Sequence, residues 1–105
     1  MLKDMIEKLS TNEGLNTIGI EGVELYKMSS QYNRLTAVMS PAICFIVQGS
    51  KNLYLGDEKY TYGEDSYLIG TVKMPIESEL LDTSEDKPYL GLIIYLDSAI
   101  ISELL

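Results

Sequence analysis

The feature that most constrains the fold is a series of short apolar and aromatic segments that runs from Gly22 to Tyr95 and is broken by turn residues. The segments are rich in β-branched and aromatic residues, which favour strands. The breaks place glycine beside short polar residues, as hairpin turns require: Gly49-Ser50, Gly56-Asp57 and Gly63-Glu64-Asp65. We therefore expect seven strands, at residues 23–28, 43–48, 52–55, 59–62, 66–71, 76–81 and 89–95. Strands at this spacing indicate a β-sandwich or barrel.

Short helices are predicted at both ends of the chain. Apolar residues recur at positions 2, 5, 6 and 9, which predicts an amphipathic helix over residues 2–10 that lies on the core of its own domain. Asp97 suits the N-cap of a second helix over residues 98–105. That helix ends on two leucines without a C-cap, so we expect the chain to be cut from something longer.

The length of 105 residues predicts one domain with a single core, and 46% hydrophobic residues are enough to form it without disulfides. Two predicted strands, within residues 42–47 and 90–96, are apolar on both faces. Their outer faces must be covered by the first helix, the C-terminal segment or a second subunit, because an uncovered apolar sheet face would associate.

The chain has one cysteine and no histidine, which excludes zinc sites built from these residues, histidine general bases and an internal disulfide. Cys44 lies in an apolar run, where an inert core thiol is favoured over a nucleophile. The acidic stretch over residues 77–86 lacks the spacing and the glycine of a calcium loop and is interpreted as a solvated edge and turn. We expect no metal and no cofactor.

The net charge is −8, with 8 Lys and Arg against 16 Asp and Glu. Such a surface repels nucleic-acid phosphates and anionic membranes, so direct binding of this chain to either is not expected. No signal peptide is visible, and no apolar run approaches the roughly 20 residues that span a bilayer. The absence of paired cysteines fits a reducing compartment, and the predicted location is the cytoplasm.

Tyrosine supplies nearly all the aromatic surface, with eight Tyr, one Phe and no Trp. Tyrosine suits half-wet pockets, although each ring can equally be a core residue whose hydroxyl reaches solvent. A ligand cavity inside a small barrel is the sharper hypothesis. Its candidate lining residues are Cys44, Gln48, Tyr54, Tyr60, Tyr62, Tyr67, Met74 and Tyr89. The pattern does not determine which strand faces point inward.

A series of motifs resembles the N-terminal domain of AraC-type transcriptional regulators over nearly the whole chain. The matching residues are Glu13-Gly14, Leu25-Tyr26, Pro41, Ile46-Val47-Gln48-Gly49-Ser50-Lys51, Gly56-Asp57, Tyr60-Thr61-Tyr62, Tyr67-Leu68, Pro75, Ser84 and Pro88-Tyr89-Leu90. The resemblance implies an all-β fold, a cupin-like double-stranded β-helix barrel with short flanking helices, here over about residues 22–96. It also implies a C-terminal helix-turn-helix DNA-binding domain, which these residues do not include.

The function implied by this resemblance is the effector-sensing regulatory domain of a bacterial transcription regulator, which is not an enzyme. Its partners would be a small-molecule effector, a second copy in a homodimer, and DNA through the missing domain. Two alternatives stay open: a dimerisation or interaction module with a solidly packed barrel, and a free-standing small cupin enzyme.

Overall fold

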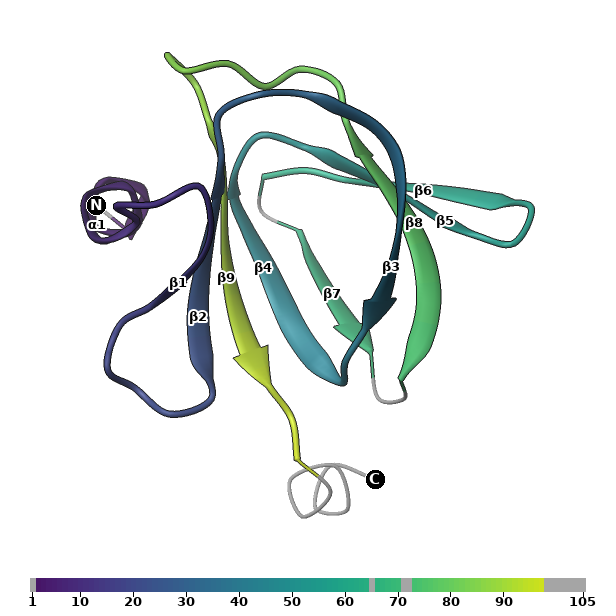
Figure 1. Cartoon of the computed structure of the whole chain (residues 1–105), viewed down its shortest axis with the longest axis horizontal. Coiled ribbons are helices and arrows are strands. Elements are labelled where there is room, and N and C mark those ends of the chain that lie inside the picture. Colours follow the sequence, from purple (N-terminus) through teal and green to yellow (C-terminus); the bar gives the residue numbers. More distant parts are fainter. Residues whose placement is uncertain (1, 65, 71–72, 98–105) are drawn as a thin grey trace.

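The computed structural model describes residues 2–64, 66–70 and 73–97, in which one helix precedes nine strands (Figure 1). The elements are α1 (Leu2–Leu9), β1 (Gly14–Thr17), β2 (Val23–Met28), β3 (Tyr32–Met39), β4 (Ala42–Gln48), β5 (Lys51–Leu55), β6 (Glu58–Tyr62), β7 (Tyr67–Gly70), β8 (Met74–Leu80) and β9 (Tyr89–Tyr95). The helix at the N-terminus confirms the predicted segment. The helix predicted over residues 98–105 lies outside the described residues.

The strands form two antiparallel sheets that face each other (Figure 1). Sheet A has the order β1-β2-β9-β4-β7, and sheet B has the order β3-β8-β5-β6. The chain crosses from one sheet to the other several times, so each sheet contains strands that are distant in sequence. Side chains that alternate toward the other sheet therefore enclose a common interior.

Glycine conformation helps to explain one hairpin, between β5 and β6, and one crossing between the sheets, from β4 to β5. Gly56 has φ +60° in the turn between β5 and β6, and Gly49 has φ +90° between β4 and β5. A Cβ at Gly49 would lie 3.4 Å from the Tyr89 backbone, at the lower limit of ordinary contact, so the positive φ and not a clash is the reason for glycine here. Of the three breaks predicted as hairpin-like, only Gly56-Asp57 joins two paired strands, β5 and β6. The predictions at Gly49 and Gly63 are wrong, because these breaks carry the chain from one sheet to the other. Positive φ angles favour glycine in both kinds of turn.

Helix α1 packs on the outer face of sheet A. Ile6 is 3% exposed and contacts Leu25 of β2 and Leu90 of β9 in one buried cluster. This helix covers part of the apolar outer face that the sequence predicts must be covered. A second cluster of Ile46, Leu80 and Tyr89 lies between the sheets.

Strands β1 and β3 were not among the seven expected strands. Strand β1 has the sequence Gly-Leu-Asn-Thr, which is too short and polar to show alternation. Strand β3 is exposed along most of its length and mixes polar with apolar residues, so its pattern lacks a clear buried face. Both are held as strands by their neighbours: β1 pairs with β2, and β3 pairs with β8.

Candidate functional site: a cavity between the two sheets

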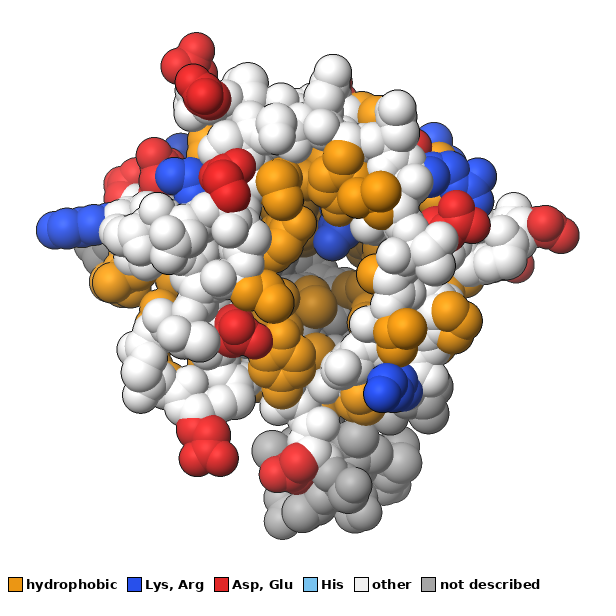
Figure 2. Space-filling view, in the orientation of Figure 1, with side chains coloured by type: hydrophobic (Ala, Val, Ile, Leu, Met, Phe, Trp, Pro, Cys, Tyr) orange, Lys and Arg blue, Asp and Glu red, His pale blue; other side chains and the backbone are white. Residues whose placement is uncertain are grey.

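A cavity of about 430 Å³ opens between sheets A and B, and its hydrophobic walls are visible in Figure 2. Sheet A contributes the inward-facing residues of β2, β9 and β4, and sheet B contributes those of β3, β5 and β8. The register explains which residues face the cavity. Tyr26 pairs with Gly91, and both line the cavity, whereas the adjacent residue Leu25 points to the other face of the sheet and is buried under α1. The volume lies within the range of small-molecule sites, roughly 300–1,000 Å³.

Among the described residues, Lys51 is the only charged one that lines this cavity, and Figure 2 shows a basic side chain inside the hollow. Its Nζ atom lies 5.3 Å from the centre of the Tyr26 ring and 5.6 Å from that of Tyr89. No carboxylate of the described residues lies within salt-bridge distance of Lys51. Burial lowers the pKa of Lys51 below its ordinary value, because the ammonium has lost much of its water.

Tyrosine rings beside Lys51 form an aromatic part of the cavity wall that carries hydroxyl groups. Tyr26 and Tyr89 meet edge to face, with ring centres 5.8 Å apart. Burial raises the pKa of Tyr26 to about 12 and also raises that of Tyr89. The Tyr32 hydroxyl lies 3.1 Å from Ser78 Oγ, and both residues line the cavity. At neutral pH Tyr26 and Tyr89 therefore offer uncharged phenols to an occupant.

Cys44 also lines the cavity. Burial raises the pKa of its thiol, and the positive charge of Lys51 only partly opposes this shift. The thiol is therefore protonated at neutral pH, which fits the interpretation of an inert thiol over that of a nucleophile.

Three of the eight candidates named from sequence, Cys44, Tyr62 and Tyr89, line the main cavity. Tyr60 and Met74 line a separate pocket of about 70 Å³ that Tyr62 also borders. The Tyr60 and Tyr62 rings stack with centres 6.3 Å apart, which confirms that they share one strand face.

Gln48 is 4% exposed, and its Nε2 atom donates to the Pro88 carbonyl at 2.7 Å. Its side chain is absent from the cavity lining. The bond ties the end of β4 to the residue before β9, so the contact seen for Gln48 is structural.

Tyr54 and Tyr67 lie outside the cavity. Tyr67 is 59% exposed and pairs in register with Phe45 of β4. Phe45 pairs in turn with Leu92, which packs against the cluster beneath α1. Tyr67 thus belongs to the outer face of sheet A.

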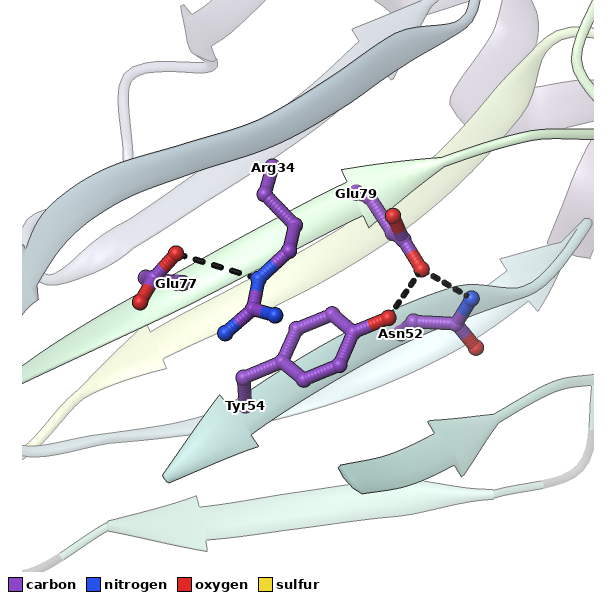
Figure 3. A network of polar contacts seen from close by, with 5 residues as sticks. All are labelled: Arg34, Asn52, Tyr54, Glu77 and Glu79. Atoms are coloured by element: carbon purple, nitrogen blue, oxygen red, sulfur yellow. Dashed lines mark hydrogen bonds and ion pairs between the residues drawn. The ribbon is translucent and has the colours of Figure 1, made fainter. Parts of the chain in front are cut away.

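Tyr54 belongs to a polar network on sheet B (Figure 3). Its hydroxyl donates to Glu79, and Asn52 Nδ2 donates to the same carboxylate at 2.9 Å. The Arg34 guanidinium lies 3.7 Å from the centre of the Tyr54 ring and pairs with Glu77 at 3.1 Å. The two hydrogen bonds to Glu79 lower the pKa of that carboxyl. This network links β3, β8 and β5 and accounts for Tyr54 as a sheet-stabilising residue.

The sequence reasoning missed Lys51, Tyr26 and Tyr32 as cavity residues. For Lys51 a signal was present, because Lys51, Leu53 and Leu55 alternate along one strand and therefore share a face. A lysine on the same face as two leucines is a candidate for burial.

Two further observations concern the described residues. They contain no group of three or more His, Cys, Asp or Glu side chains placed to hold a metal ion. Their one helix is too short to cross a membrane.

Comparison with known proteins supports the fold and the family. A sequence model described as the AraC-type transcriptional regulator N-terminus matches residues 19–105. A solved structure of a protein from Neisseria meningitidis superimposes with a TM-score of 0.57 at 19% identity, covering 91% of this chain and 97% of that chain. A cupin-2 domain protein from Shewanella frigidimarina gives a TM-score of 0.59 at 7% identity, covering 91% and 93%. These likenesses confirm the predicted cupin-like, all-β fold. A search of curated proteins finds no match.

Proposed function

We propose that this chain, which belongs to the family of AraC-type transcriptional regulator N-termini, senses a small molecule that binds between its two sheets. The observation that carries the proposal is the cavity of about 430 Å³, whose walls are mainly apolar with a few polar groups. That combination is typical of small-molecule sites. In this proposal the DNA is bound by a separate domain, which agrees with the net charge of −8.

The cavity is suited to sensing because its walls come from both sheets. Tyr26 and Tyr89 belong to sheet A, whereas Lys51 and Leu53 belong to sheet B. An occupant that touches both walls stabilises one separation of the sheets over others, and only such differential binding shifts a conformational equilibrium. A change of sheet separation would be transmitted to whatever packs on the outer faces.

The proposed role is regulatory, and no reaction is assigned. The thiol of Cys44 is protonated at neutral pH, and no carboxylate of the described residues lines the cavity. The cavity is thus suited to holding a molecule unchanged. Location in the cytoplasm stays a prediction.

Native mass spectrometry of the chain, titrated with a metabolite library, tests the proposal. Ala37→Trp places an indole at the cavity opening, where Ala37 is exposed and lines the wall. Asn33→Trp is the matched control, because it lies on the same strand, is exposed and does not line the cavity. We expect a saturable ligand that A37W weakens and N33W does not. Equal binding by both variants, or no saturable ligand, would refute the cavity as the sensor.

A second candidate function is a dimerisation or interaction module. The observation that favours it is an exposed apolar patch on the outer face of sheet A, formed by Phe45, Tyr67 and Ile69, which are 36%, 59% and 50% exposed. Sedimentation of the chain and of Tyr67→Asp separates the two candidates. A dimer that this change dissociates, in a chain without a saturable ligand, would favour the module.

A further inference from the structure

The apolar surroundings of Lys51 and its lack of a counter-charge among the described residues indicate which class of molecule binds in the cavity. Lysine is seldom buried unless paired, because removing an ammonium from water is costly. Lys51 is partly buried, and burial lowers its pKa. Here the charged group points into an apolar cavity with two tyrosine rings as its nearest compensation. A cation over a ring gains less than a charged partner supplies in a desolvated site. The cavity therefore contains the positive charge of Lys51, which no negatively charged side chain of the described residues neutralises.

We propose that the ligand is a monoanion with an apolar body, a carboxylate that pairs with Lys51 while its hydrocarbon part fills the cavity. The inference rests on the proposed function, since it names the ligand class of that cavity. A carboxylate supplies the missing counter-charge, and the apolar walls bury the rest of the molecule.

Other ligand classes fit the lining less well. A phosphate ester carries close to two charges and is usually held by several basic groups, whereas the described part of the chain places only one basic residue, Lys51, in the cavity lining. A sugar needs many hydrogen-bonding partners, but most of the wall is apolar. A cationic ligand would be repelled by Lys51. One negative charge on an apolar frame matches the lining best.

The chain offers variants that isolate the charge. Lys51→Met keeps a stem of similar length and removes the ammonium, so the fold is retained without the desolvation cost. Lys51→Arg keeps the charge. Lys59→Met is the matched control, because Lys59 is exposed on β6, does not line the cavity, and its loss changes the net charge equally.

The experiment is a nuclear magnetic resonance titration of the isotope-labelled chain with 4-phenylbutanoate and naphthylacetate, each compared with its neutral primary amide. Shifts at Gly91 and Leu53 report occupancy of the cavity. We expect each carboxylate to bind about tenfold or more tightly than its amide in the wild type and in K59M, as a charged hydrogen bond predicts. K51M removes this preference, and K51R retains it.

The outcomes separate the two proposals. Equal binding of carboxylates and amides by the wild type, or a preference that survives in K51M, would overturn the anionic ligand and leave the sensing cavity intact. If neither form shifts the cavity signals in the wild type, the anionic ligand with an apolar body is overturned, and the metabolite titration decides whether the cavity senses another class of molecule.

Discussion

Replacing Ile6 with alanine tests how helix α1 is held on sheet A. Ile6 is 3% exposed and contacts Leu25 and Leu90, which are also buried. These residues form the described cluster between the helix and the sheet. The change removes the main apolar anchor of α1 and leaves the strands untouched.

The magnitude follows from the groups removed. Ile→Ala deletes three carbons, worth about 0.8 kcal/mol each in transfer, or about 2.4 kcal/mol. The unfilled space adds about 1 kcal/mol, because a helix on the surface can settle partly into it. Alanine returns about 0.4 kcal/mol through its higher helix propensity. We expect the free energy of unfolding to fall by about 3 kcal/mol and the midpoint temperature by about 12 °C.

Urea unfolding monitored by circular dichroism measures this loss. Met5→Ala is the control, because Met5 is 55% exposed on the same helix and its truncation should change stability by about 0.5 kcal/mol or less. A loss below about 1 kcal/mol in I6A, or an equal loss in M5A, would refute the docking of α1 through Ile6. Amide exchange in α1 should quicken in I6A more than in β9.

Two other predictions concern the interior. Gln48→Leu leaves the Pro88 carbonyl without the donor it now has at 2.7 Å, so the free energy of unfolding measured in urea should fall by about 1–3 kcal/mol. The affinity for any cavity ligand should be unchanged. A change in affinity at unaltered stability would contradict the structural role. Tyr26 and Tyr95 have pKa values of about 12 in the fold, against 10.0 for the free side chain. The unfolded chain therefore loses these protons first, and stability should fall as the pH rises from about 10 to 12. Ultraviolet titration measures the ionisation of the tyrosines. Tyr26→Phe should make the fall in stability with pH less steep. An equally steep fall in that variant would disprove that Tyr26 contributes to it.

The local elements follow from the sequence with little ambiguity. Helix α1 needs only the apolar stripe that contains Ile6, and the turns at Gly49 and Gly56 need only glycine beside a polar residue. Strand β9 is an apolar run too short for most helices and rich in isoleucine. Each of these signals lies within a few residues of chain, so no distant contact is required to interpret it.

The tyrosines show the limit of this reasoning. Alternation places Tyr60 and Tyr62 on one face of β6, as observed. It does not say whether that face is inside. Tyr54 and Lys51 lie on β5 at positions of opposite parity, and only the pairing of β5 with β8 determines that Lys51 faces the cavity and Tyr54 the polar network with Glu79.

The sequence by itself therefore determined the strand-rich fold, the positions of the turns, the first helix and the acidic surface, because these depend on neighbouring residues and on composition. Only the tertiary structure decided which strand faces form the cavity and that Lys51 is the charge within it. Inward and outward are defined by which sheet covers which, and that relation joins strands far apart in the chain. A strand carrying tyrosine or leucine on both faces contains no local signal for that choice.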